Sequence, residues 1–221
     1  MLKRFEFNYE LNYKVFPRRE SLKGSIKPFT SNLNLYYEGL LKIRELASQG
    51  LSKEFSEKNI VHFIDWMDSD LNVMLGLEFS LALEIFGGNT KLLTMISIGS
   101  NSEQTKKRLW GTAWDLFHAR MSCNRPQISR MVGRETDPIF VTKDYALFKI
   151  MAPSVLHGIR FNSTMFKITQ SNEYPHHYSR EFMDKLNEKL LRLSVDRVSE
   201  KIDIDDSNVL SIIKSLESNL E

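Results

Sequence analysis

Two aspartates stand in stretches where an unpaired carboxylate would be costly. Asp115 lies inside a mostly apolar helical run, residues 109–117, and Asp144 follows a short strand-like run, residues 139–142. A buried carboxylate usually has a cation, a metal ion or hydrogen-bond donors beside it, because burial of the unpaired charge is unfavourable. A helix acid followed by a strand-end acid is typical of a metal-dependent nuclease pocket. The two aspartates therefore predict a divalent-metal site.

Hydrolysis of a phosphodiester with a divalent metal needs several oxygen ligands from different elements. Carboxylate oxygens suit Mg²⁺ or Mn²⁺, and the bound ion lowers the pKa of a coordinated water and stabilises charge in the transition state. We therefore expect several acids to converge on one cofactor ion. The candidate ligands are Glu78, Asp115 and Asp144, completed by Glu10 or Asp65.

Basic side chains are concentrated in residues 103–160, although the whole chain has a formal charge of only +2. Basic groups around acids that hold a metal would attract a phosphate backbone. The first candidates for contact with RNA phosphates are Lys106, Lys107, Arg108 and Lys143. A solvated basic surface without a ligand is the alternative explanation.

Each predicted site residue also has an ordinary structural explanation. Glu78 would then pair with a lysine or arginine, and Asp115 would pair with Arg120 or cap a loop. Asp144 would be the N-cap of a helix that starts at residue 145, a common role for aspartate. Thr142, a further candidate that would support the metal site beside Asp144, would be an ordinary strand residue. The sequence leaves both sets of roles open.

Composition restricts the class of protein. The chain has 221 residues and 42% hydrophobic residues, which fits a globular protein of one large domain, or of one domain with an appendage. Cys123 is the only cysteine, so an intrachain disulfide and a cysteine-rich zinc site are excluded. No phosphate-binding loop, dinucleotide-binding glycine pattern or serine nucleophile elbow is present. Without a signal-peptide core or a membrane-length apolar stretch, we expect a cytoplasmic protein with no membrane partner.

Segments with strand-like and helix-like spacing of apolar residues alternate along the chain. This alternation predicts an α/β fold with three layers around a mainly parallel sheet. Strands are expected at residues 3–13, 92–98, 139–142 and 164–169. Helices are expected at residues 33–48, 56–67, 70–86, 100–121, 179–202 and from 206 onward. We divide the chain into an α/β domain, residues 1–170, and a C-terminal helical extension, residues 171–221. The extension would join two copies, hold a protein partner, or pack on its own domain.

Three stretches resemble the PIN-like nuclease superfamily: Trp-Asp-Leu-Phe-His at 114–118, Val-Thr-Lys-Asp at 141–144 and Leu-Glu-Phe-Ser-Leu-Ala at 77–82. The resemblance covers about residues 3–169. It implies the three-layer fold and cleavage of single-stranded RNA by a divalent-metal mechanism. It also implies that the protein acts as a toxin or as a defence effector. In this family, the counterparts of Thr142 and Asp144 face the metal, and the counterpart of Glu78 is an internal ligand.

One position departs from the family pattern. The family's first strand normally ends in aspartate, whereas Tyr-Glu-Leu-Asn at residues 9–12 places Glu10 there. Glutamate is one methylene longer and would shift the metal. This departure leaves an alternative, a catalytically degenerate PIN-like scaffold that acts as an interaction subunit of a larger complex. A nucleic-acid-binding regulator that uses the basic stretch alone is a third hypothesis.

Overall fold

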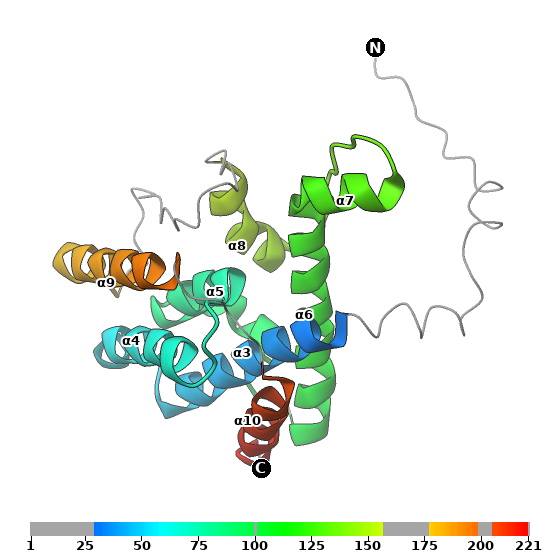
Figure 1. The fold of residues 1–221 in the computed structure, drawn as a ribbon. Helices are drawn as coiled ribbons and strands as arrows, with labels where there is room; N and C mark the ends of the chain where they lie inside the picture. Colours follow the sequence, from blue (N-terminus) through cyan, green and yellow to red (C-terminus); the bar gives the residue numbers. More distant parts are fainter. Residues whose placement is uncertain (1–28, 100, 157–176, 199–204, 221) are drawn as a thin grey trace.

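A computed structural model describes residues 29–99, 101–156, 177–198 and 205–220. All regular secondary structure within these ranges is helical, and no β-strand occurs in them (Figure 1). The predicted three-layer α/β fold with a parallel sheet is therefore wrong for the described part of the chain.

Two of the four predicted strands fall in the described ranges. Residues 92–98 were expected as a buried strand, but Thr90–Ile96 forms a 3₁₀-helix, η2. Its buried residues Leu92, Met95 and Ile96 are three and four positions apart, which is helical spacing, and a short apolar run does not by itself distinguish helix from strand. Residues 139–142 join no sheet among the described residues. The predicted strands 3–13 and 164–169, and with them Glu10, lie outside the described residues.

Helix α3 (Thr30–Gln49) is the centre of the arrangement. It contacts α4 (Lys53–Ser69), α5 (Gly76–Phe86), α6 (Ser102–Cys123) and α10 (Asp206–Ser218). Figure 1 shows α3 crossing between these helices. The predicted helices 33–48 and 56–67 are confirmed as α3 and α4. The helix predicted at residues 70–86 begins only at Gly76, because residues 70–75 form the connection from α4.

A glycine permits the close crossing of α3 and α5. A Cβ atom at Gly39 would lie 2.8 Å from Cδ1 of Leu75 and 3.1 Å from Cγ of Glu78. The absence of a side chain therefore allows α5 to approach the α3 backbone. This approach brings the buried carboxylate of Glu78 between α3 and α6.

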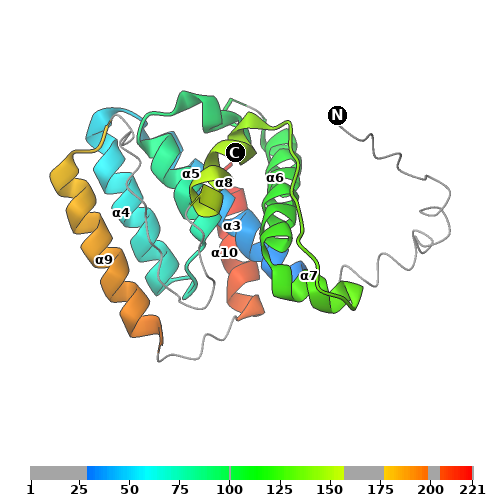
Figure 2. The same cartoon turned by 90° about the horizontal axis from the view of Figure 1, so that it is seen from above.

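The long helix α6 carries Asp115, and Asp144 immediately precedes the short helix α8 (Tyr145–Leu156). Asn101 caps α6 by accepting a hydrogen bond from the Gln104 N–H at 2.9 Å, so the helix predicted at residues 100–121 is confirmed with its start at Ser102. Helix α7 (Arg125–Val132), which was not among the predicted helices, follows α6 directly. The chain then runs back beside α6 to α8 (Tyr145–Leu156), as Figure 2 shows.

The two predicted helices of the C-terminal region are confirmed as α9 (Arg180–Val198) and α10. Helix α9 lies against α4, where the Arg197 guanidinium contacts the Asp68 carboxylate at 2.7 Å, and α10 packs on α3 (Figure 2). The predicted domain boundary near residue 170 falls outside the described residues. None of the helices in the described ranges is both long and apolar enough to cross a membrane.

His177, which precedes α9, is hydrogen-bonded to the end of α5. The His177 N–H donates to the carbonyl oxygen of Gly87 at 3.3 Å, and His177 Nδ1 lies 2.9 Å from the Ser56 hydroxyl. Gly88 has a φ of 100°, and a Cβ there would lie 2.7 Å from His177 Nε2. Backbone geometry and the imidazole ring both require glycine at this position.

Candidate functional site

Asp115 lies on the outer face of α6. The inner face of this helix is formed by the buried residues Leu109, Ala113 and Leu116, so the apolar run that surrounds Asp115 in the sequence points away from it. Asp115 is therefore exposed at the surface and only partly screened from water, and a ligand in solvent can reach it.

Asp144 stands immediately before α8 and caps it. Its Oδ1 accepts hydrogen bonds from the N–H groups of Ala146 at 2.7 Å and Leu147 at 3.1 Å. Its own N–H donates to the hydroxyl oxygen of Thr142 at 3.0 Å. The helix-cap alternative stated for Asp144 is thus observed. Because the cap uses Oδ1 alone in these bonds, it does not exclude a ligand at Oδ2.

Asp115 and Asp144 belong to separate elements that contact each other, since α6 packs against α8, and the charge of one carboxylate acts on the other. Partial burial raises the pKa of Asp115 above its usual value, and the negative charge of Asp144 raises this pKa further, while the His118 imidazole lowers it. Two neighbouring carboxylates repel each other, so an added cation would be attracted to the pair. We call Asp115 and Asp144 the acid pair.

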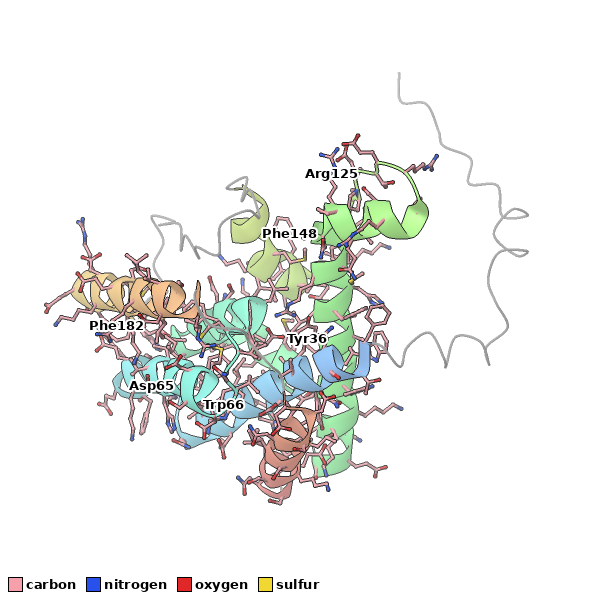
Figure 3. All side chains as sticks on the ribbon, in the orientation of Figure 1. Tyr36, Asp65, Trp66, Arg125, Phe148 and Phe182 are labelled. Carbon is pink, nitrogen blue, oxygen red and sulfur yellow. The ribbon has the colours of Figure 1, made fainter. Side chains whose placement is uncertain are left out.

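Glu78 belongs to a different cluster. Its side chain is completely buried and forms an ion pair with Arg120 of α6. The Arg120 guanidinium also lies 3.9 Å from the centroid of the Tyr36 ring, and Figure 3 shows Tyr36 on α3 near α6. Burial raises the Tyr36 pKa, which Arg120 lowers and Glu78 raises. This cluster joins α3, α5 and α6.

Among the remaining predicted ligands, Glu78 and Asp65 pair with other side chains, and Glu10 lies outside the described residues. Asp65 lies on α4 and pairs with Lys189 of α9. No group of three or more histidine, cysteine, aspartate or glutamate side chains that could hold a metal occurs among the described residues. Glu78 therefore does not join Asp115 and Asp144 in such a group. The ligand roles of Glu78, Asp65 and Glu10 stay predictions.

The predicted phosphate contacts have different environments. Lys143, adjacent to Asp144, is exposed, as are Lys107 and Arg108 on α6. Lys106 forms an ion pair with Glu217 of α10 at 3.1 Å. Of these four side chains, Lys143 is therefore the one closest in sequence to the acid pair.

Sequence reasoning missed Glu38 on α3. Glu38 is completely buried, and neither of its carboxyl oxygens has a hydrogen-bond partner among the described residues. Burial raises the pKa of Glu38 to about 8, and the negative charge of Asp70 contributes to this rise. The sequence did contain an indication that Glu38 is buried. Leu35 and Leu41 stand three residues before and after it and therefore share its face of the helix.

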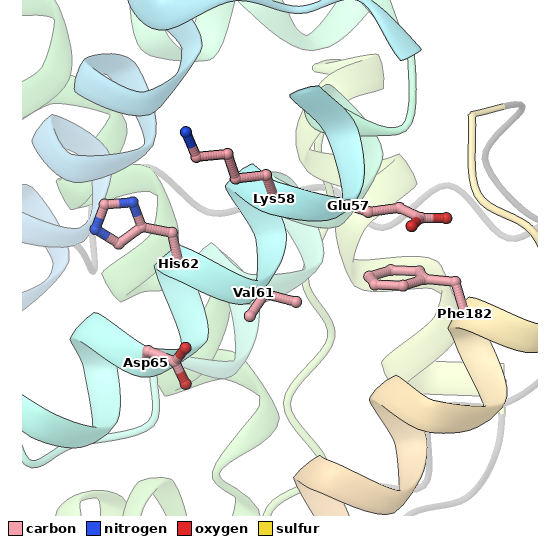
Figure 4. Close-up of a pocket in the computed structure, with 6 residues that line it drawn as sticks. All are labelled: Glu57, Lys58, Val61, His62, Asp65 and Phe182. Atoms are coloured by element: carbon pink, nitrogen blue, oxygen red, sulfur yellow. The ribbon is translucent and has the colours of Figure 1, made fainter. Parts of the chain in front are cut away.

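A shallow pocket between α4 and α9 is separate from the acid pair. It is lined by Glu57, Lys58, Val61, His62, Asp65 and Phe182. Figure 4 shows the Phe182 ring of α9 directed toward α4 near Glu57 and Val61. The pocket combines apolar surface with side chains of both charges and does not by itself indicate one class of ligand.

Comparison with protein-family models, with curated proteins and with solved structures finds no match for this chain. A functional proposal must therefore rest on the residues and geometry described above.

Proposed function

We propose that the protein is a metal-dependent endoribonuclease that cleaves single-stranded RNA at the acid pair, Asp115 and Asp144. The observation that carries this proposal is that an exposed carboxylate on α6 and the carboxylate that caps α8 lie on contacting helices, close enough for the charge of Asp144 to raise the pKa of Asp115. This activity does not require a PIN-like fold. It depends on a pair of neighbouring acids that solvent reaches.

The donor chemistry of the acid pair fits a hydrated Mg²⁺ or Mn²⁺. Magnesium sites that act on phosphates usually have one or two carboxylates, with waters and substrate oxygens completing the shell. Asp115 and Asp144 would hold the ion, which when bound supplies a more acidic water and a positive charge beside the phosphate. The hydrogen bond from the Asp144 N–H to Thr142 fixes the backbone in front of α8. Lys143 would contact a substrate phosphate.

The test compares Mn²⁺ binding by calorimetry and cleavage of a labelled single-stranded RNA for the wild type, Asp115→Asn and Asp144→Asn. Asparagine also caps helices well, so Asp144→Asn retains the start of α8. Both variants should lose Mn²⁺ binding and cleavage, whereas Asp184→Asn, an exposed acid on α9, should retain them. Wild-type cleavage by Asp115→Asn would refute the assignment.

A second candidate function is that of a non-catalytic interaction subunit. Ile139 and Val141 are each 85% exposed on the segment between α7 and α8. Exposed apolar side chains so close together favour contact with another protein. This function predicts a metal-independent complex that Ile139→Ser disrupts, and it predicts no cleavage of RNA by the wild type.

A further inference from the structure

Two aromatic side chains are exposed at the start of α8, beside the acid pair. Tyr145 is 55% exposed and Phe148 is 59% exposed, and Figure 3 shows Phe148 on this helix. Residues three apart are neighbours on a helix surface, so the two rings share one face. The opposite face carries the buried residues that anchor α8, namely Ala146, Leu147 and Ile150. Packing of α8 therefore does not require rings at positions 145 and 148.

Positive charge accompanies these rings. The Lys91 ammonium of η2 lies 6.0 Å from the centroid of the Tyr145 ring. Lys143 is exposed two residues before Tyr145. Lysine is depleted in interfaces between proteins, whereas surfaces that bind single-stranded nucleic acid combine basic groups with aromatic rings. The combination of charge and aromatic surface favours a nucleic-acid strand over an apolar protein partner.

We propose that Tyr145 and Phe148 stack against unpaired bases of an RNA strand that passes Lys143 and the acid pair. The inference rests on the proposed function for the choice of RNA, but the stacking itself needs no metal. Bases in a duplex already stack on their neighbours and cannot offer their faces to a side chain, so these rings select single strands. Tyr145 and Phe148 are thus specificity-determining residues.

The experiment measures binding of a fluorescent oligoadenylate by anisotropy in EDTA, so that cleavage does not contribute. Loss of one base–aromatic stack weakens binding roughly 5- to 150-fold, and we expect losses in this range for Tyr145→Ala and Phe148→Ala. Tyr145→Phe keeps the ring and should bind as the wild type does, whereas Tyr145→Leu keeps apolar area without a ring and should bind as weakly as Tyr145→Ala. Leu210→Ala removes an exposed apolar side chain from α10 and should change nothing.

Failure of this inference is distinguishable from failure of the proposed function. Wild-type affinity in Tyr145→Ala and Phe148→Ala, or an absence of RNA binding by the wild type, overturns the inference. Wild-type affinity in Tyr145→Leu also overturns it, because it would show that the RNA needs apolar area at this position and not an aromatic ring. If the aromatic variants bind weakly while Asp115→Asn still cleaves RNA, the stacking surface stands and the acid pair is not the catalytic site. Far-ultraviolet circular dichroism verifies that each variant is folded.

Discussion

Glu38 makes the stability of this protein depend on pH in a way that can be calculated. The pKa of Glu38 is raised from 4.5 to about 8 by burial and by Asp70, so the folded protein keeps a proton that the unfolded chain releases. Between these two values the unfolded state binds fewer protons than the folded state. The free energy of unfolding therefore falls as pH rises from about 4.5 to about 8, and the loss is complete above about pH 8.

The size of the effect follows from the same two pKa values. Each unit of difference corresponds to about 1.4 kcal/mol, so a rise from 4.5 to about 8 costs on the order of 5 kcal/mol once Glu38 ionises in the folded state. Glutamine resembles the protonated carboxyl in shape and does not titrate. Glu38→Gln should therefore resemble the wild type in stability near pH 4.5 and exceed it by a few kcal/mol at pH 8.

Urea unfolding of the wild type and Glu38→Gln at several pH values from 5 to 8 measures this difference. The matched control is Glu188→Gln, the same substitution at an exposed position of α9. It should leave the pH dependence unchanged. A constant difference between Glu38→Gln and the wild type across this range would refute the reasoning, because it would show that Glu38 has the same charge in the folded and unfolded states.

Other substitutions test the packing that positions the site, each by urea unfolding. Arg120→Ala leaves the buried Glu78 carboxylate without its cation and should cost about 3–5 kcal/mol, so a loss below about 1 kcal/mol would contradict the buried pair. Gly39→Ala should destabilise by about 1–2 kcal/mol because its Cβ meets α5, whereas Gly111→Ala, with open space around it, should stabilise by up to about 1 kcal/mol. Gly88→Ala should cost about 1–3 kcal/mol through its positive φ and the imidazole ring packed against it, and wild-type stability would argue against both constraints.

Parts of the candidate site followed from local sequence alone. The helix-cap role of Asp144 was one of the predicted alternatives, because aspartate before a helix can accept bonds from the first N–H groups within its own segment. The partner of Glu78 was predicted only as a class, a lysine or arginine. Arg120 was instead suggested for Asp115, five residues away on the same helix. Its actual partner, Glu78, is 42 positions away in the sequence, so only the crossing of α5 and α6 determines the pair.

The sequence by itself determined where most helices lie, because apolar spacing and capping residues act within a few positions of one another. It also marked Asp115 and Asp144 as residues of interest. Tertiary structure decided that the short apolar runs at 92–98 and 139–142 join no sheet in the described part of the chain, since a strand needs a partner that its own residues do not specify. Tertiary structure likewise buried Glu38 without a partner among the described residues and brought the acid pair together. Charge and burial depend on neighbours that lie far apart in the sequence, and only folding supplies them.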